Sequence, residues 1–212
     1  TSGKLYFKDA VLKELSTINS IPESILETGG IKIYTSLNME AQSIMEKSIN
    51  DNITKEDMQV ASIIINPHTG GVMALSGGVD YSKSQFNRAI SSKRQIGSTM
   101  KPILYYSALE NGFTSASCFT SEKTTFNFSS GQTYTYANSS ISMGAAIAYS
   151  DNIYAVKTHL FLGENNLINT ANRLGIESNL QPIPSLALGT EEISLLEMVS
   201  AYSSFANLGY FE

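Results

Sequence analysis

The pattern of apolar and polar positions predicts a mixture of helices and strands in the first third of the chain. A short helix is expected over residues 6–15, an alternating strand over 31–35, and an amphipathic helix over 39–49 capped by Ser36 or Asn38. Two β-rich runs, 60–66 and 72–76, are separated by Pro-His-Thr-Gly-Gly, which predicts a hairpin with His68 as a solvated turn residue.

From residue 98 onward the pattern becomes mostly helical. Apolar positions between 100 and 109 fit a largely buried helix over 98–111, ended by Asn111-Gly112. Pro102 fits only in the first turn of that helix, which places Ser98 at its N-terminus. Residues 114–140 predict loops with short strands. Further helices are expected at 141–149, 153–162, 165–174 and 191–207.

Composition narrows the possible partners. The 212 residues are 42% hydrophobic, enough for one sizeable core. The net charge of -5 and the scattered Lys and Arg residues argue against nucleic acid as a partner.

The single cysteine, Cys118, is interpreted as a small buried residue, and no internal disulfide is possible. Two distant histidines and no Cys/His cluster give no support to a metal site, and no cofactor is expected. No apolar run reaches membrane-spanning length and no signal-peptide pattern appears, so we expect any anchor or export signal outside these residues.

Ser98 and Lys101 form a candidate pair for covalent acyl transfer. In a helix their spacing places the hydroxyl and the amine on one face, one turn apart. A serine becomes a good nucleophile when a base takes its proton, and a desolvated, neutral lysine can be that base. The helix N-terminus would stabilise negative charge on an attacked carbonyl oxygen. A Ser-x-x-Lys spacing also occurs in ordinary surface helices, so spacing alone leaves both interpretations open.

A second polar element, Ser150-Asp151-Asn152, lies in a break between two predicted helices. A hydroxyl there can shuttle a proton to a leaving amine, and an amide can bond both Lys101 and a substrate carbonyl. Alternatively, Ser150 and Asp151 simply cap the following helix. The spacing alone does not choose between these two interpretations.

Taken together, Ser98-Thr-Met-Lys101 and Ser150-Asp-Asn152 resemble the first two motifs of penicillin-binding proteins and serine β-lactamases. The flanking residues are similar to the transpeptidase domain of class A (bifunctional) penicillin-binding proteins. The similarity runs from about residue 31 to 212, and the segments that carry it are Phe-Asn-Arg-Ala at 86–89, 94–102, 148–157, Leu-Ala-Leu-Gly at 186–189, and the pattern over 31–42 and 196–207. Ile96 and Met100 stand where that family usually has proline and phenylalanine.

The resemblance implies an α/β (α+β) fold of the penicillin-binding and serine β-lactamase type. An antiparallel sheet packed by helices would begin with the 60–76 hairpin, with an all-helical lobe beside it and a cleft between them. Residues 31–212 would be the N-terminal portion of the transpeptidase domain. Residues 1–30 would be a linker from a membrane-anchored, glycosyltransferase-bearing portion.

The third motif of the family, Lys-Thr/Ser-Gly, does not occur in these 212 residues. Lys157-Thr-His lacks the glycine and falls in a predicted helix, so it is no substitute. We therefore expect a second polypeptide or a missing segment to carry the rest of the transpeptidase domain, and the site of this chain alone to be incomplete.

The resemblance also implies a role for each candidate residue. Ser98 would attack the D-alanyl-D-alanine carbonyl of a peptidoglycan stem peptide, and Lys101 would accept its proton. Ser150 would relay that proton, while Asn152 would orient Lys101 and hold the substrate amide. The Ser98 N–H would supply half of an oxyanion hole. An acceptor amine would then form the cross-link, β-lactams would imitate the donor, and the protein would act in the bacterial cell envelope, on the extracytoplasmic face of the cytoplasmic membrane.

Three alternatives to a transpeptidase remain open. A class A β-lactamase needs a deacylating glutamate in a Glu-x-x-Leu-Asn pattern, and neither Glu164 nor the pair Glu191 and Glu192 leads such a pattern. A β-lactam sensor would be acylated once and act as a receptor, although residues 86–102 resemble transpeptidases more. An inert fragment is the third.

Overall fold

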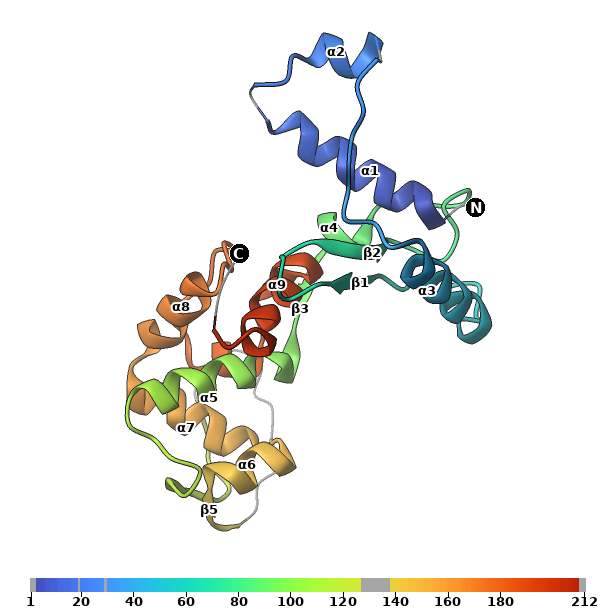
Figure 1. The fold of residues 1–212 in the computed structure, drawn as a ribbon. Helices are drawn as coiled ribbons and strands as arrows, with labels where there is room; N and C mark the ends of the chain where they lie inside the picture. The colour runs from blue at the N-terminus through green and yellow to red at the C-terminus, as the bar shows by residue number, and fades with distance from the viewer. Residues whose placement is uncertain (1–2, 19, 29, 127–137, 210–212) are drawn as a thin grey trace. The chain divides into compact units, whose positions relative to one another are not determined.

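The computed structural model describes residues 3–18, 20–28, 30–126 and 138–209 (Figure 1). The α-helices are α1 (Gly3–Ser16), α2 (Glu23–Thr28), α3 (Met39–Asn52), α4 (Arg88–Ser91), α5 (Lys101–Glu110), α6 (Met143–Tyr149), α7 (Asn152–Leu162), α8 (Glu164–Arg173) and α9 (Leu195–Ala206). The strands are β1 (Ser62–Ile65), β2 (Val72–Ser76), β3 (Lys93–Gln95), β4 (Cys118–Ser121), β5 (Ser139–Ser142) and β6 (Glu192–Ser194). Two 3₁₀ helices, η1 (Gly97–Met100) and η2 (Pro184–Leu188), complete the described elements. The mixed α/β class expected from the sequence is confirmed.

The chain divides into two compact units. The first consists of Thr1–Lys93 with Ser194–Glu212, and the second is Arg94–Ile193. All four candidate site residues lie in the second unit. No helix in the described part of the chain is long and apolar enough to span a membrane.

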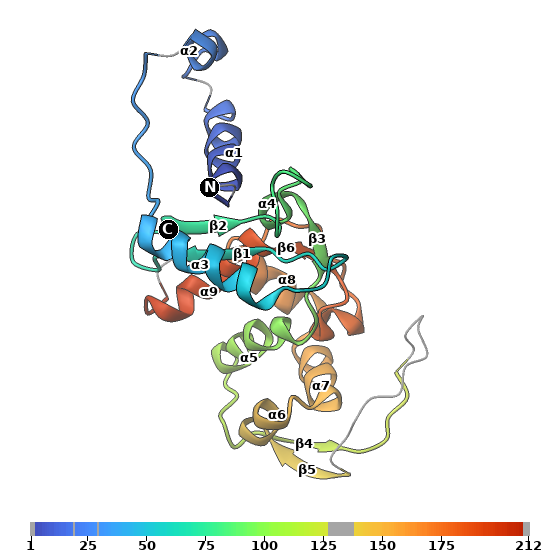
Figure 2. The same ribbon diagram turned by 90° about the vertical axis from the view of Figure 1, so that its right-hand side faces the viewer.

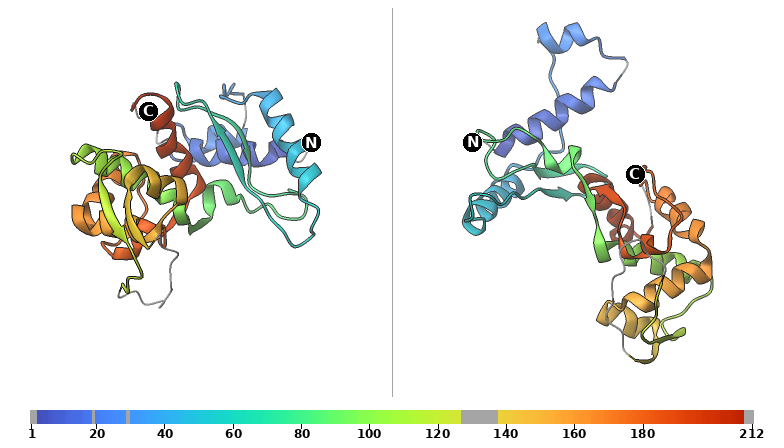
Figure 3. Two further views of the ribbon diagram at one scale, coloured as in Figure 1. Left: turned by 90° about the horizontal axis from the view of Figure 1, so that it is seen from below. Right: turned by 180° about the vertical axis from the view of Figure 1, so that it is seen from behind.

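The first unit is built around the predicted hairpin. Strands β1 and β2 pair antiparallel, with Ile63 opposite Leu75 and Ile64 opposite Ala74. Because successive side chains of a strand point to opposite faces, Leu75 packs with Tyr6 of α1 while Ala74 packs on α3. Helices α1 and α3 therefore cover opposite faces of the hairpin (Figure 3).

Helix α1, predicted over residues 6–15, is anchored to the loop that follows β2. The Tyr6 hydroxyl donates to the carbonyl oxygen of Ser84 at 2.5 Å, and the Tyr81 hydroxyl donates to the Asp9 carboxylate at 2.5 Å. The two tyrosine rings meet edge to face with their centroids 4.9 Å apart. The division of the chain into a linker and a domain at residue 30 stays a prediction.

The predicted strand at 31–35 is wrong, because these residues belong to no strand in the described structure. The chain reaches β2 only after residue 35, where the Ser36 hydroxyl donates to the Val72 carbonyl and the Asn38 N–H donates to the Met73 carbonyl. These two contacts do not form a continuous strand ladder. The alternation of apolar and polar residues at 31–35 was therefore insufficient to predict a strand. Asn38 caps α3 as expected, its side-chain oxygen accepting from the Ala41 N–H at 2.9 Å.

In the second unit α5, α7 and α8 pack against one another, while β4 packs on α7 and β5 on α6 (Figure 2). The predicted helix over 98–111 is present as η1 followed by α5, with Pro102 in the first turn of α5 and Gly112 at φ +87° after its end. The helices predicted at 141–149, 153–162 and 165–174 correspond to α6, α7 and α8. Part of the 114–140 prediction lies outside the described residues.

Two further predictions are corrected. The helix expected over 191–207 begins only at Leu195, because Glu192–Ser194 forms β6 and pairs with β3. Ser194 ends that strand and starts α9 through a capping box with Glu197. Cys118 is exposed rather than buried, because β4 and β5 form a two-stranded ribbon whose outer positions stay open to solvent.

Candidate active site

Ser98 lies where the chain turns from β3 into the first helical turn. Gly97 adopts a left-handed φ of +58° and starts η1, so Ser98 is the second residue of that helix and is exposed. The Lys101 N–H donates to the Ser98 carbonyl oxygen, which joins η1 to α5. Lys101 consequently follows Ser98 by one tight turn, as its spacing predicts.

The ammonium group of Lys101 has three hydrogen-bond acceptors. Its Nζ lies 2.7 Å from the Ser150 carbonyl oxygen, 2.9 Å from Ser150 Oγ and 2.6 Å from Asn152 Oδ1. An ammonium carries three N–H donors, so the three acceptors use its full hydrogen-bonding capacity. The structure thus brings Lys101, Ser150 and Asn152 together although α5 and the α6–α7 junction are about fifty residues apart.

Ser150 lies between Ser98 and Lys101. The hydroxyl oxygens of Ser98 and Ser150 are 3.5 Å apart, a longer separation than the 2.9 Å between Ser150 Oγ and Lys101 Nζ. Within the described residues, Ser98 is therefore connected to the amine through a second hydroxyl. Hydroxyl contacts in sites without substrate are often long and shorten on binding.

The backbone around Ser150 explains how two short side chains reach the lysine. Ser150 ends α6 in the left-handed conformation with φ 53° and ψ 45°, a geometry that costs a residue with a side chain about 1–3 kcal/mol. Asp151 then starts α7, its carboxylate accepting from the Tyr154 N–H at 2.7 Å and from the Ser121 hydroxyl at 2.6 Å. Both interpretations of the sequence hold in part: Asp151 caps the helix, and Ser150 and Asn152 contact Lys101.

Burial favours the neutral form of the Lys101 amine. Only 4% of Lys101 is exposed, and desolvation lowers the pKa of its amine below the ordinary value of 10.5. The nearby carboxylate of Asp151 opposes this effect and raises the pKa. Asp151 was assigned only a capping role from the sequence. An effect of its charge on Lys101 could have been predicted, because Asp151 lies between Ser150 and Asn152 in the motif.

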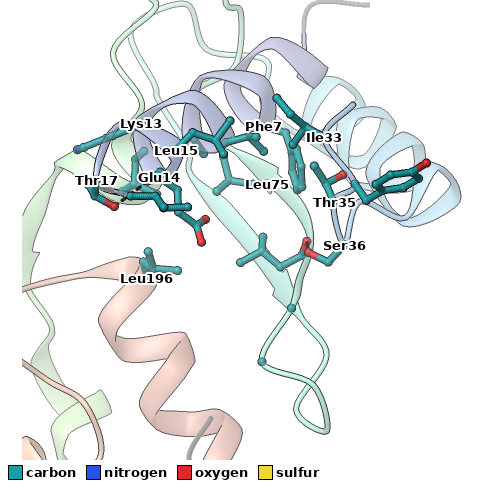
Figure 4. A pocket seen from close by; sticks show the side chains of 18 residues that line it. Phe7, Lys13, Glu14, Leu15, Thr17, Ile33, Thr35, Ser36, Leu75 and Leu196 are labelled. Atoms are coloured by element: carbon teal, nitrogen blue, oxygen red, sulfur yellow. Dashed lines mark hydrogen bonds between the residues drawn. The ribbon is translucent and has the colours of Figure 1, made fainter. Parts of the chain in front are cut away.

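A cavity of about 730 Å³ lies in the first unit, lined mainly by apolar side chains such as Phe7, Leu15, Ile33 and Leu196 (Figure 4). None of the four candidate residues lines it. Among the described residues, no group of three His, Cys, Asp or Glu side chains is placed to hold a metal ion.

The fold and the two motifs define a class of protein, and comparison with known families agrees. The chain belongs to the penicillin-binding protein transpeptidase domain family, whose model matches residues 60–212. This confirms the resemblance stated from the two motifs.

The chain is also similar to individual penicillin-binding proteins. It is 46% identical over 213 residues to penicillin-binding protein 2D of Bacillus subtilis, covering 96% of this chain and 31% of that protein. It is 36% identical over 160 residues to penicillin-binding protein 1A of Aquifex aeolicus, covering 72% of this chain and 22% of that protein. The chain thus spans less than a third of the length of these relatives. The solved structure of penicillin-binding protein PonA1 from Mycobacterium tuberculosis matches with a TM-score of 0.88 over 100% of this chain and 59% of that one, at 23% identity, which shows a shared fold.

Proposed function

We propose that the chain supplies the nucleophile, the base and the proton relay of a peptidoglycan D,D-transpeptidase that works through a serine acyl-enzyme. The observation that carries the proposal is the placement of a buried lysine amine within hydrogen-bond distance of Ser150 and Asn152, with the Ser98 hydroxyl next to Ser150. Family membership supports it.

Acylation begins when Ser98 Oγ attacks the carbonyl carbon of the penultimate D-alanine, in the peptide bond that joins the two D-alanines of a stem peptide. As the C–O bond forms, the Ser98 proton passes to neutral Lys101, with Ser150 as the intervening hydroxyl. The tetrahedral intermediate collapses by breaking the C–N bond. The departing D-alanine amine takes up the proton through Ser150, which returns Lys101 to its neutral form.

The negative oxygen of the intermediate needs donors, and the Ser98 N–H at the start of the helical segment is one of them. Asn152 holds Lys101 in place through its Oδ1, and its Nδ2 group is left to donate to a substrate carbonyl. We assign the second oxyanion donor and the recognition of the substrate carboxylate to a segment that carries the Lys-Thr/Ser-Gly motif, on the same protein or on a second polypeptide.

An amine from a neighbouring stem peptide then attacks the ester and forms the cross-link. A β-lactam would acylate Ser98 in the same way and remain attached, because its leaving group stays tethered to the acyl moiety. Peptidoglycan as substrate places this chemistry in the bacterial cell envelope, outside the cytoplasmic membrane. We further propose residues 31–212 as part of the transpeptidase domain and residues 1–30 as a linker.

One assay tests this function and its alternatives. The intact protein is incubated with a stem peptide ending in D-alanyl-D-alanine and an acceptor amine, and released D-alanine and cross-linked product are measured by mass spectrometry. The proposal predicts both products, their loss in Ser98→Ala, and their retention in the surface control Ser43→Ala. Acyl-enzyme without cross-linking would indicate a sensor, and rapid turnover of penicillin in a parallel incubation would indicate a β-lactamase. Release of D-alanine that persists in Ser98→Ala would overturn the proposal.

A further inference from the structure

A close backbone contact lies directly beside the proposed nucleophile. The Gly97 N–H donates to the Gly189 carbonyl oxygen at 3.0 Å. A Cβ atom added to Gly189 would lie 2.0 Å from the Gly97 carbonyl oxygen and 2.7 Å from the Gly97 carbonyl carbon. These are backbone atoms, which cannot move aside as the end of a flexible side chain can. Position 189 therefore has room for glycine alone.

The Gly97 carbonyl carbon and oxygen belong to the peptide group that joins Gly97 to Ser98, while the Gly97 N–H that bonds Gly189 belongs to the preceding peptide group. A peptide group is planar, so its carbonyl oxygen and carbon move together with the N–H of the next residue. That N–H is the Ser98 donor assigned to the oxyanion. A displacement of the Gly97 carbonyl would consequently tilt the Ser98 N–H and shift the Ser98 Cα, which carries the reacting hydroxyl.

The segment that presents Gly189 is itself firmly held. Leu186 and Ala187 of η2 are completely buried, and the Gly189 N–H donates to the Leu186 carbonyl at 2.9 Å. The Thr190 hydroxyl lies 3.1 Å from the carbonyl oxygen and 2.9 Å from Oγ of Ser185, which braces the turn. The turn is thus a stable surface against which Gly97 packs.

We propose that Gly189 is a positioning residue for the acylation reaction, which holds the Gly97–Ser98 peptide group so that the Ser98 N–H and hydroxyl face the substrate together. This inference rests on the proposed function. It predicts that Gly189 affects the chemical step rather than the initial binding of a β-lactam.

The test compares Gly189→Ala with Gly112→Ala in the intact protein. Both glycines have a positive φ, +68° at Gly189 and +87° at Gly112, but a Cβ at Gly112 meets nothing within 4 Å. This control therefore carries the backbone strain without the steric contact. Stopped-flow acylation by a labelled penicillin separates the dissociation constant of the non-covalent complex from the acylation rate constant. Because misplacing reacting groups by an ångström costs about 100-fold in rate, we expect Gly189→Ala to lower the rate constant by about 10- to 100-fold. The dissociation constant should change less than about twofold, as expected when only transition-state stabilisation is lost.

A second variant covers the case in which Gly189→Ala does not fold. Thr190→Val keeps the shape of the side chain but removes both hydroxyl contacts with Ser185, and it should lower the acylation rate constant by about threefold. Rate constants of Gly189→Ala or Thr190→Val that match wild type and Gly112→Ala would overturn the inference while leaving the proposed function intact. Wild-type protein that is not acylated, or that is acylated equally well as Ser98→Ala, would overturn both.

Discussion

The side-chain oxygen of Asn152 lies 2.6 Å from Nζ of Lys101, and this contact ties the start of α7 to the start of α5. Ser150 adds its carbonyl and hydroxyl oxygens to the same amine at 2.7 and 2.9 Å. The two sequence motifs meet at one nitrogen atom. The chemical state of that nitrogen should therefore govern reactivity.

Replacing Lys101 by Met should abolish most acylation. Methionine fills a similar buried volume but cannot accept a proton, so the rate constant for acylation by penicillin should fall by about 10²–10⁴-fold. The thermal unfolding midpoint should not fall, because the variant also removes the cost of burying an amine. Acylation within about threefold of wild type would contradict the role of Lys101 as the base.

Ser150→Ala separates proton relay from positioning. The variant removes Oγ but keeps the Ser150 carbonyl oxygen, 2.7 Å from Lys101 Nζ, so the lysine stays in place. We expect acylation to slow by about 10²-fold, since the hydroxyl between Ser98 and Lys101 is lost. Ser142→Ala, at the cap of α6, is the matched control. If the two variants behave alike, Ser150 has no relay role.

Asp151→Asn should shift the pH dependence of acylation. The carboxylate of Asp151 raises the pKa of Lys101, so removing its charge lowers that pKa further. Because the base acts only when neutral, the acidic limb of the pH–rate profile should move to lower pH. The asparagine oxygen can still accept from the Tyr154 N–H, which preserves the helix cap. Glu191→Gln is the charge control, and a shift to higher pH in Asp151→Asn would refute the assignment.

His159 should make the fold sensitive to acid. It is fully buried, its Nε2–H donates to the Ile183 carbonyl at 3.0 Å, and desolvation lowers the pKa of the imidazole below 6.5. The unfolded state therefore binds the proton first as pH falls, so stability is complete above about pH 6.5 and declines below it.

His159→Gln retains an N–H donor without a titratable ring. Between about pH 7.5 and pH 5.5 its unfolding midpoint should fall less than that of wild type, as measured by thermal denaturation followed by circular dichroism. Equal losses in the two proteins would show that His159 does not cause the acid sensitivity.

Local signals in the sequence predicted much of the second unit. Gly112 and Gly163 mark the ends of α5 and α7, and Pro102 marks the start of α5, so these boundaries follow from backbone preferences. Residues 31–35 and 192–194 were assigned wrongly because strand formation depends on a partner that the local pattern does not reveal. Cys118 was predicted to be buried because cysteine side chains are usually buried, whereas its position on a two-stranded ribbon leaves it exposed.

The sequence indicated the residues of the candidate site but not all of their contacts. Motif spacing indicated Ser98, Lys101, Ser150 and Asn152. Their convergence on one amine, and the position of Ser150 between Ser98 and Lys101, depend on how α5 packs against α7. The contact between Gly97 and Gly189 joins residues 92 positions apart and has no local signature.

The central claim is that Ser98 is the nucleophile, and the intact mass of the protein tests it most directly. After incubation with penicillin, the wild-type protein should gain the mass of one penicillin molecule, since ring opening adds the acyl group without losing atoms. Ser98→Ala should gain none, and Ser43→Ala should behave as wild type. A mass increase retained in Ser98→Ala would contradict the account.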